Sequence, residues 1–313
     1  MRNKFILKFA MISVAAVSLA SAPIGAQAQA AGTKPVNVIV TVLGKGKEAA
    51  PEVTEDSVNV HQDGKARPVL GWQRLPEDGQ GLELIVYVDG SVDASVANQL
   101  QDVSAFIRAL PREASAEVVY SYGGEPQIVQ SPTTDRELAA KSVRIPSGRF
   151  AASSGLYAGL EDFAKHLPDG GSRRVFLVIS NGIDLLRGVG ESDPGINPDL
   201  QSAIDELHRK DISVYAIYAG GGGRMLENEY LVNNGQGCLA RLAAETGGEF
   251  FSMGLSTPID FEPYLKDVSE GLTHQYLLTF AAVTSTKAHL STLRVGVEVE
   301  GADVLAPDHV FVP

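Results

Sequence analysis

The chain has 313 residues, of which 44% are hydrophobic and 20% are charged, a balance typical of a globular protein with one large unit and a small one. Its formal net charge of −12 argues against nucleic acids and anionic membranes as partners, because they carry the same sign of charge. Cys238 is the only cysteine, which excludes an internal disulfide, so stability must come from burial of an apolar core.

The first 30 residues have the pattern of a secretory signal peptide. Three basic residues precede a mostly apolar run over 9–19, and small-x-small cleavage sites follow at 26–28 and 28–30. A membrane anchor is the alternative, but the apolar run is short, and serines and Pro23 interrupt or follow it. We therefore expect that residues 1–30 are removed and that the protein is exported, periplasmic or secreted, without a stable membrane anchor.

The next segment, 34–76, has the pattern of short β-strands. It opens with valine at every second position, and the alternation resumes over 57–62. Asp63-Gly64 is a strong hairpin signal between two such runs. Pro68 lies inside the following run, which predicts that this strand runs along a sheet edge.

From Leu82 to Leu272 strands alternate with helices. The predicted strands are 84–88, 114–122, 127–130, 173–180, 212–218 and 249–252. The predicted helices are 95–110, 134–143, 155–166, 199–210, 238–246 and 261–272. Three of the strands are near-continuous apolar runs, as expected for parallel strands buried on both faces. The segment predicts an α/β fold with a doubly wound, mostly parallel sheet, helices on both faces and an antiparallel hairpin at one edge.

Beyond His274 the pattern is all-β to the end of the chain, with predicted strands at 276–282, 293–300 and 310–312. Strands at both ends of the chain, with an α/β segment between them, predict one small β module. In this interpretation the strands of 274–313 pack with those of 34–76.

Three loops rich in oxygen-bearing side chains are predicted at the carboxyl edge of the sheet. The first runs from Asp89 through Ser91 to Asp93, the second contains Ser153-Ser154, and the third is Ser180-Asn181-Gly182-Ile183-Asp184. Open α/β sheets bind ligands at the carboxyl ends of their strands, so these side chains are expected to converge. The structural alternative is that Asp89 and Ser91 only bond loop amides and cap the helix that follows.

The first strand, loop and helix resemble the first βα unit of a von Willebrand factor A (VWA) domain. The metal-ion-dependent adhesion site of that family begins with Asp-x-Ser-x-Ser, and Asp89-x-Ser91-x-Asp93 matches two of the three positions. In the bacterial, exported VWFA-related proteins the second loop carries a metal-binding threonine in Gly-Thr-x-Leu-Tyr, and the third an aspartate in Ser-Asp-Gly. This chain has Ser154 and Asn181 at those positions.

The resemblance extends beyond the site and spans nearly the whole mature chain. Residues 53–65 are similar to the family's N-terminal segment, 239–249 to a helix in its last third, and 275–278 to its exit strand. The resemblance implies the VWA fold, a degenerate metal site, and binding or adhesion to a protein partner outside the cytoplasm, without catalysis.

The implied metal site would hold Mg²⁺ with Asp89, Ser91, Asp93, Ser154 and Asn181. Such a site needs hard oxygen ligands and one position left for a carboxylate of the partner. The number of carboxylates is the same as in the site of the family that the chain resembles, because Asp93 stands where a serine is usual and Asn181 where an aspartate is usual. Direct coordination by Asp93 would weaken the attraction of the ion for a partner's carboxylate.

Two functions of other classes compete with protein binding. A serine-type hydrolase would use Ser91 or Ser154 with Asp89, but the sequence shows no plausible base near either serine. A periplasmic small-molecule receptor needs two α/β lobes, and the chain has one run of alternating strands and helices.

Other reactive residue types carry little functional signal. None of the six histidines pairs at metal-ligand spacing, so we expect them on the surface. They are His61, His166, His208, His274, His289 and His309. Cys238 is interpreted as a small buried apolar residue. The glycines of 220–223 lack the form of a phosphate-binding loop, which favours a flexible loop.

Overall fold

The computed structural model describes residues 32–46, 48–92, 94–146, 155–170, 173–220, 228–254 and 259–313. The expected signal peptide, Asp93 and Ser154 lie outside this set. No helix of the described residues has both the length and the apolarity needed to cross a membrane.

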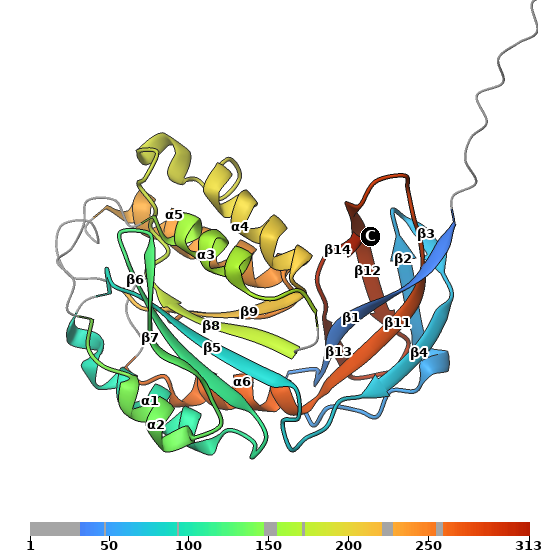
Figure 1. Ribbon diagram of the computed structural model, residues 1–313, viewed down its shortest axis with the longest axis horizontal. Coiled ribbons are helices and arrows are strands. Elements are labelled where there is room, and N and C mark those ends of the chain that lie inside the picture. The colour runs from blue at the N-terminus through green and yellow to red at the C-terminus, as the bar shows by residue number, and fades with distance from the viewer. Residues whose placement is uncertain are drawn as a thin grey trace, which may run out of the picture. The chain divides into compact units, whose positions relative to one another are not determined.

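A six-stranded sheet forms the centre of the α/β part, with the order β10-β9-β8-β5-β6-β7 (Figure 1). Its strands are β5 (Leu82–Asp89), β6 (Ser115–Tyr122), β7 (Glu125–Thr133), β8 (Arg173–Ser180), β9 (Ile212–Tyr218) and β10 (Phe250–Phe251). All neighbouring pairs are parallel except β6 and β7, which form the predicted antiparallel hairpin at the edge. The runs of β8 and β9 are buried along their whole length, as expected where both faces are covered.

Two layers of helices cover the sheet, one on each face (Figure 1). The layer on one face contains α1 (Gln99–Ala109), α2 (Arg136–Ser142) and α6 (Glu262–Thr273). The layer on the other face contains α3 (Leu156–His166), α4 (Pro198–Arg209) and α5 (Glu229–Glu245). Each layer forms its own apolar core with the sheet. The doubly wound α/β fold predicted from the alternation is therefore confirmed.

The strand order reverses between β5 and β8, which are direct neighbours. The helix after β5 lies on one face of the sheet and the helix after β8 on the other. The carboxyl ends of these two strands therefore form the topological switch point, the usual place for a ligand site in such sheets. Asp89 ends β5 and Ser180 ends β8.

Both ends of the chain build the β module, which has two four-stranded sheets. One sheet contains β13 (Ala302–Leu305), β1 (Thr33–Gly44), β11 (Gln275–Val283) and β4 (Val69–Arg74). The other contains β14 (His309–Val312), β12 (His289–Val297), β2 (Val58–Gln62) and β3 (Lys65–Arg67). Strands from the two chain ends alternate in the first sheet, and in the second sheet β12 of the C-terminal segment pairs antiparallel with β2 of the N-terminal segment. The predicted module from both ends is confirmed.

The start of α5 corrects a sequence-based prediction. The pattern predicts a helix only over 238–246, but α5 begins at Glu229. The Asn228 side chain accepts hydrogen bonds from the amides of Tyr230 and Leu231, and so caps the additional turns. Gly235 and Gly237 lower the intrinsic helix propensity there, but close packing of Gly235 against Asn181 outweighs that preference.

Candidate functional site

Asp89 is the centre of the predicted site and is only 2% exposed. Its Oδ2 atom accepts a hydrogen bond from Ser180 Oγ at 2.6 Å, and its Oδ1 accepts one from the amide of Ser91 at 2.9 Å. The Ser91 contact is the local turn that the structural alternative predicts. The Ser180 contact is a link between two neighbouring parallel strands.

Asn181 and Ser91 meet beside Asp89. Asn181 Nδ2 donates to Ser91 Oγ at 3.3 Å, and Asn181 Oδ1 accepts from the amide of Ile183 at 2.8 Å. The structure thus brings together three of the five predicted metal ligands. The other two, Asp93 and Ser154, lie outside the described residues. In the hydrolase hypothesis the Ser91 hydroxyl would be the nucleophile and would need a base. Its Oγ atom accepts a hydrogen bond from the side-chain amide of Asn181, and the Ser91 side chain also hydrogen-bonds Asp89.

Asp184 is a buried carboxylate at this edge to which the sequence reasoning gives no role. Its Oδ1 accepts from the amide of Leu186 at 2.9 Å, and its Oδ2 accepts from the amide of Tyr157 at 3.4 Å. Tyr157 lies in the first turn of α3, where backbone amides have no partner within the helix. Asp184 therefore joins the third loop to the start of α3. The sequence places Asp184 at the end of the third predicted loop, but does not reveal this contact with α3.

The helix α5 packs directly against the third loop through two glycines. A Cβ atom at Gly235 would lie 2.4 Å from the carbonyl oxygen of Asn181. A Cβ atom at Gly182 would lie 2.2 Å from the carbonyl oxygen of Gly235, and Gly182 also has a left-handed φ of 70°. No side chain fits at either position without displacing backbone. This close contact fixes the backbone that carries Asn181.

The electrostatics of the site are dominated by buried negative charge. Burial raises the pKa of Asp89, hydrogen bonds from Ser180 and Ser91 oppose this rise, and the charge of Asp184 adds to it. Burial also raises the pKa of Asp184, which hydrogen bonds from Leu186 and Tyr157 oppose. Among the described residues, no Lys or Arg forms an ion pair with either carboxylate. The site therefore favours the approach of a proton or a cation.

Cys238 is buried in the helical layer near this site, as the sequence predicts. Its neighbour Tyr157 donates a hydrogen bond from its hydroxyl to the carbonyl oxygen of Gly182 at 2.9 Å. Burial raises the pKa of the Cys238 thiol to about 12, so the thiol is neutral and unreactive at physiological pH.

The expectation that all histidines are on the surface is wrong for His208. Its side chain is buried, and its ring lies against Asp308 and His309. Sequence spacing does not reveal this group, because about 100 residues separate His208 from the other two. The contact arises because β14 returns to the end of α4.

The structure of this chain is similar to several solved structures. The chain matches no protein-family model and no curated protein. The von Willebrand factor type A protein from Catenulispora acidiphila is 10% identical with a TM-score of 0.42, covering 91% of this chain and 75% of that one. The vWF domain of the type V pili tip protein Mfa5 from Porphyromonas gingivalis is 10% identical with a TM-score of 0.44, covering 61% and 95%. The manganese-loaded TRAP protein of Plasmodium vivax is 12% identical with a TM-score of 0.41, covering 77% and 98%.

The strand order of the sheet, its antiparallel edge hairpin and the place of Asp89 at the switch point match the fold that the sequence resemblance implies. This chain has the von Willebrand factor A fold. The role of the site in this VWA fold depends on its own residues.

The residues of this VWA fold fit a divalent cation only in part. The carboxylate of Asp89 and the hydroxyl of Ser91 are hard oxygen donors of the kind that Mg²⁺ prefers. Asn181 turns its nitrogen toward Ser91, because its oxygen is bound by the amide of Ile183. It therefore adds neither a negative charge nor a free oxygen in this rotamer. The described donors suit a weakly held cation.

Proposed function

We propose that this protein is exported and binds another protein through the carboxyl edge of its VWA fold, without catalysing a reaction. The observation that carries this proposal is the meeting of Asp89, Ser91 and Asn181 at the switch point of the sheet. Loops at this position are free to vary without disturbing the core, and they stand on rigid strands. They are therefore suited to recognition.

Exposed apolar side chains on the same edge support a protein partner. Of the ten large hydrophobic residues that are exposed in the described part of the chain, six lie on segments that follow the carboxyl ends of β8, β9 and β10. They are Leu186, Val189, Ile196, Tyr230, Met253 and Ile259. Protein interfaces are enriched in large apolar and aromatic residues, which supply most of their binding energy.

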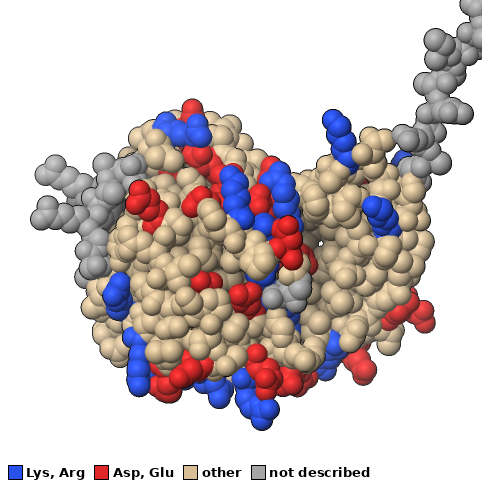
Figure 2. Space-filling model, viewed as in Figure 1, with Lys and Arg blue, Asp and Glu red and all other residues tan. Residues whose placement is uncertain are grey.

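The charges elsewhere on the surface give no reason to expect a nucleic acid. On α3 and α4, Lys165 pairs with Glu161 at 2.6 Å and Arg209 pairs with Glu206 at 2.8 Å. Figure 2 shows Lys and Arg side chains next to Asp and Glu over these helices. Such neutralised charge does not attract a phosphate backbone, which requires an excess of basic residues.

A weakly held Mg²⁺ ion is the second part of the proposal. Asp89 and Ser91 would hold it, and Asp93 and Ser154 would complete the set as the sequence resemblance implies. Asn181 would contribute only a neutral amide oxygen, after rotation of its side chain. The bound ion would supply an electron-poor centre that attracts a carboxylate of the partner.

Site-directed photo-crosslinking in the native host tests the interaction. A photoreactive side chain at Leu186 or Val189 is expected to crosslink to one partner protein, which mass spectrometry identifies. Leu70 on β4 and Ile128 on β7 are matched controls, because they are equally large, apolar and exposed but lie away from this edge. If crosslinks form equally from the control positions, or from no edge position, the proposal is wrong.

A further inference from the structure

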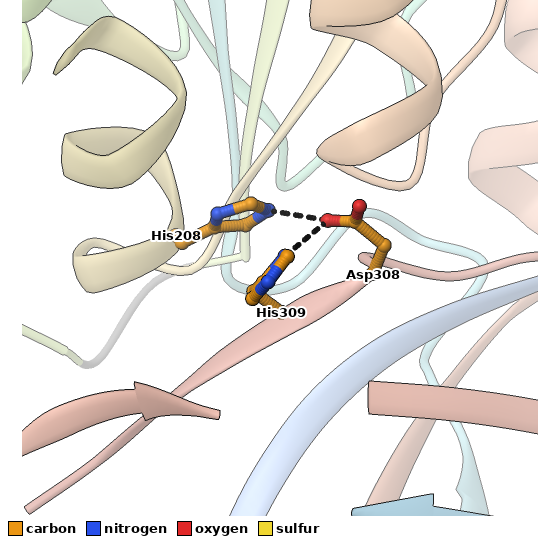
Figure 3. A group of neighbouring side chains, drawn as sticks. All are labelled: His208, Asp308 and His309. Carbon is orange, nitrogen blue, oxygen red and sulfur yellow. Dashed lines mark hydrogen bonds and ion pairs between the residues drawn. The ribbon is translucent and has the colours of Figure 1, made fainter. Parts of the chain in front are cut away.

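Three potential metal ligands meet where the α/β part touches the β module (Figure 3). His208 lies near the end of α4, and Asp308 and His309 lie at the start of β14. His309 Nδ1 is 2.8 Å from Asp308 Oδ1, and His208 Nε2 is 3.4 Å from the same oxygen. The three ligand atoms lie within 4.8 Å of one another. Both rings turn toward the carboxylate, as the dashed lines show.

The spacing of these atoms suits a tetrahedral ion. Ligands about 2.1 Å from Zn²⁺ in a tetrahedron stand about 3.4 Å apart, so only small shifts would be needed to place an ion among the three atoms. A donor set of two imidazoles and one carboxylate suits borderline transition metals such as Zn²⁺ better than it suits Mg²⁺. This chemistry differs from that of the Asp89 edge, where the described donors are hard oxygens.

The group has one buried side and one side open to solvent. The side chain of His208 is 2% exposed, whereas those of Asp308 and His309 are 45% and 36% exposed. Asp308 and His309 also line an open groove of about 800 Å³, together with His61, Arg294 and other residues of β2 and β12. An ion can therefore enter from the groove, and a water or another donor from that side can take the fourth position.

The present hydrogen-bond partner of His208 Nε2 has a second donor. His208 Nε2 lies 2.7 Å from the carbonyl oxygen of Glu245. The amide of Asp308 donates to the same carbonyl oxygen at 3.0 Å, so that oxygen keeps a hydrogen bond when Nε2 turns to a metal. His208 Nδ1 is buried and has no hydrogen-bond partner among the described residues. A cavity of about 10 Å³ beside the ring has room for one water molecule to bond it.

We propose that His208, Asp308 and His309 form a three-ligand site for a transition-metal cation of the Zn²⁺ class, with the fourth position open to the groove. A bound ion would tie β14 of the β module to α4 of the α/β part. Because the folded chain assembles the three ligands, the ion would stabilise the folded state by mass action. The site is independent of the Asp89 edge.

Calorimetric titration of Zn²⁺ into the purified protein, free of any histidine tag, tests the site. We expect one Zn²⁺ per chain, with Mg²⁺ unable to compete. His309→Gln and Asp308→Asn should each weaken Zn²⁺ binding at least tenfold, and both change partly exposed side chains. His166→Gln is the matched control, because His166 is an exposed histidine on α3 and should leave the affinity unchanged. Asp89→Ala should also leave it unchanged.

A second measurement does not depend on how the variants fold. Addition of Zn²⁺ to the unaltered protein should shift the imidazole NMR signals of two of the six histidines, those of His208 and His309, and should raise Tm. The proposal is overturned if the unaltered protein binds no Zn²⁺, or if other histidines shift instead. It is also overturned if folded His309→Gln, checked by circular dichroism, binds Zn²⁺ as tightly as the unaltered protein.

Discussion

Ser180 Oγ donates a 2.6 Å hydrogen bond to Asp89 Oδ2, joining the ends of two neighbouring parallel strands across the switch point of the sheet. Ser180 Oγ also accepts a hydrogen bond from the amide of Gly182 at 2.9 Å. One serine therefore fixes both the orientation of the buried carboxylate and the turn of the third loop. This linkage places the charge of Asp89 at the edge where Ser91 and Asn181 meet.

Because the charge of Asp89 is buried, we expect the protein to become more stable when a neutral side chain replaces this carboxylate. Its pKa is raised by burial, so the folded state holds the proton more tightly than the unfolded state does. The penalty is absent below the ordinary pKa of an aspartate, about 4, grows as the pH rises from there to the raised pKa, and stays constant above it. Asp89→Asn should therefore raise Tm at neutral pH by roughly 2–4 °C, corresponding to about 1 kcal/mol.

Calorimetric melts over a range of pH measure this effect. The difference in Tm between Asp89→Asn and the unaltered protein should shrink as the pH falls toward 4. Asp56→Asn is the control, because Asp56 is exposed and its removal should change Tm little at any pH. A lower Tm for Asp89→Asn at neutral pH would contradict the reasoning.

The neutral side chain of Asn181 predicts weak cation binding that one substitution improves. Asn181→Asp replaces the nitrogen now facing Ser91 with a carboxylate oxygen, while the amide of Ile183 keeps an acceptor. Calorimetric titration of Mg²⁺ and Mn²⁺ should show tighter binding for Asn181→Asp, roughly tenfold or more, and loss of binding for Asp89→Ala. If neither the unaltered protein nor Asn181→Asp binds either ion, the loop is structural and partners are held by ordinary surface contacts.

The contact between Gly235 and the third loop predicts a large cost for a small substitution. Gly235→Ala would place Cβ 2.4 Å from the carbonyl oxygen of Asn181, so α5 and the loop must separate. We expect a loss of about 1–3 kcal/mol in the free energy of unfolding, measured in urea. Gly190→Ala is the control, because its Cβ would have nothing within 4 Å. Equal stability of the two variants would show that the loop yields freely.

The pattern of residues 1–30 predicts a shortened exported protein. Intact-mass measurement of periplasmic or secreted material should show a chain that begins near Gln29 or Ala31. Recovery of exported protein that retains Met1 would refute a cleaved signal peptide.

The shared sheets of the β module predict that its two halves protect each other. Deletion of 276–313 removes β11, the strand that pairs with β1 along its length from Thr33 to Thr41. The valines of β1 would then lose their cover, and 36–75 should become sensitive to protease while the α/β part stays folded. Protease resistance of 36–75 after the deletion would mean that the N-terminal strands are stable alone.

The sequence alone is sufficient for the main features of the fold and for part of the site. Apolar runs locate β5, β8 and β9, because strands buried on both faces need apolar side chains at successive positions. The carboxyl-edge rule then brings Asp89, Ser91 and Asn181 together, because parallel strands end at a common edge. These inferences rest on local patterns, which a single stretch of chain carries in full.

Only the tertiary structure decided which more distant residues meet. The early start of α5 depends on packing of Gly235 against the Asn181 loop, which outweighs the low helix propensity of glycine. The role of Asp184 depends on the first turn of α3, which lies 27 residues earlier in the chain. The group of His208 with Asp308 and His309 depends on β14 returning to α4. Such contacts join segments far apart in sequence, so no local periodicity records them, and they are set by how the sheets and helices pack.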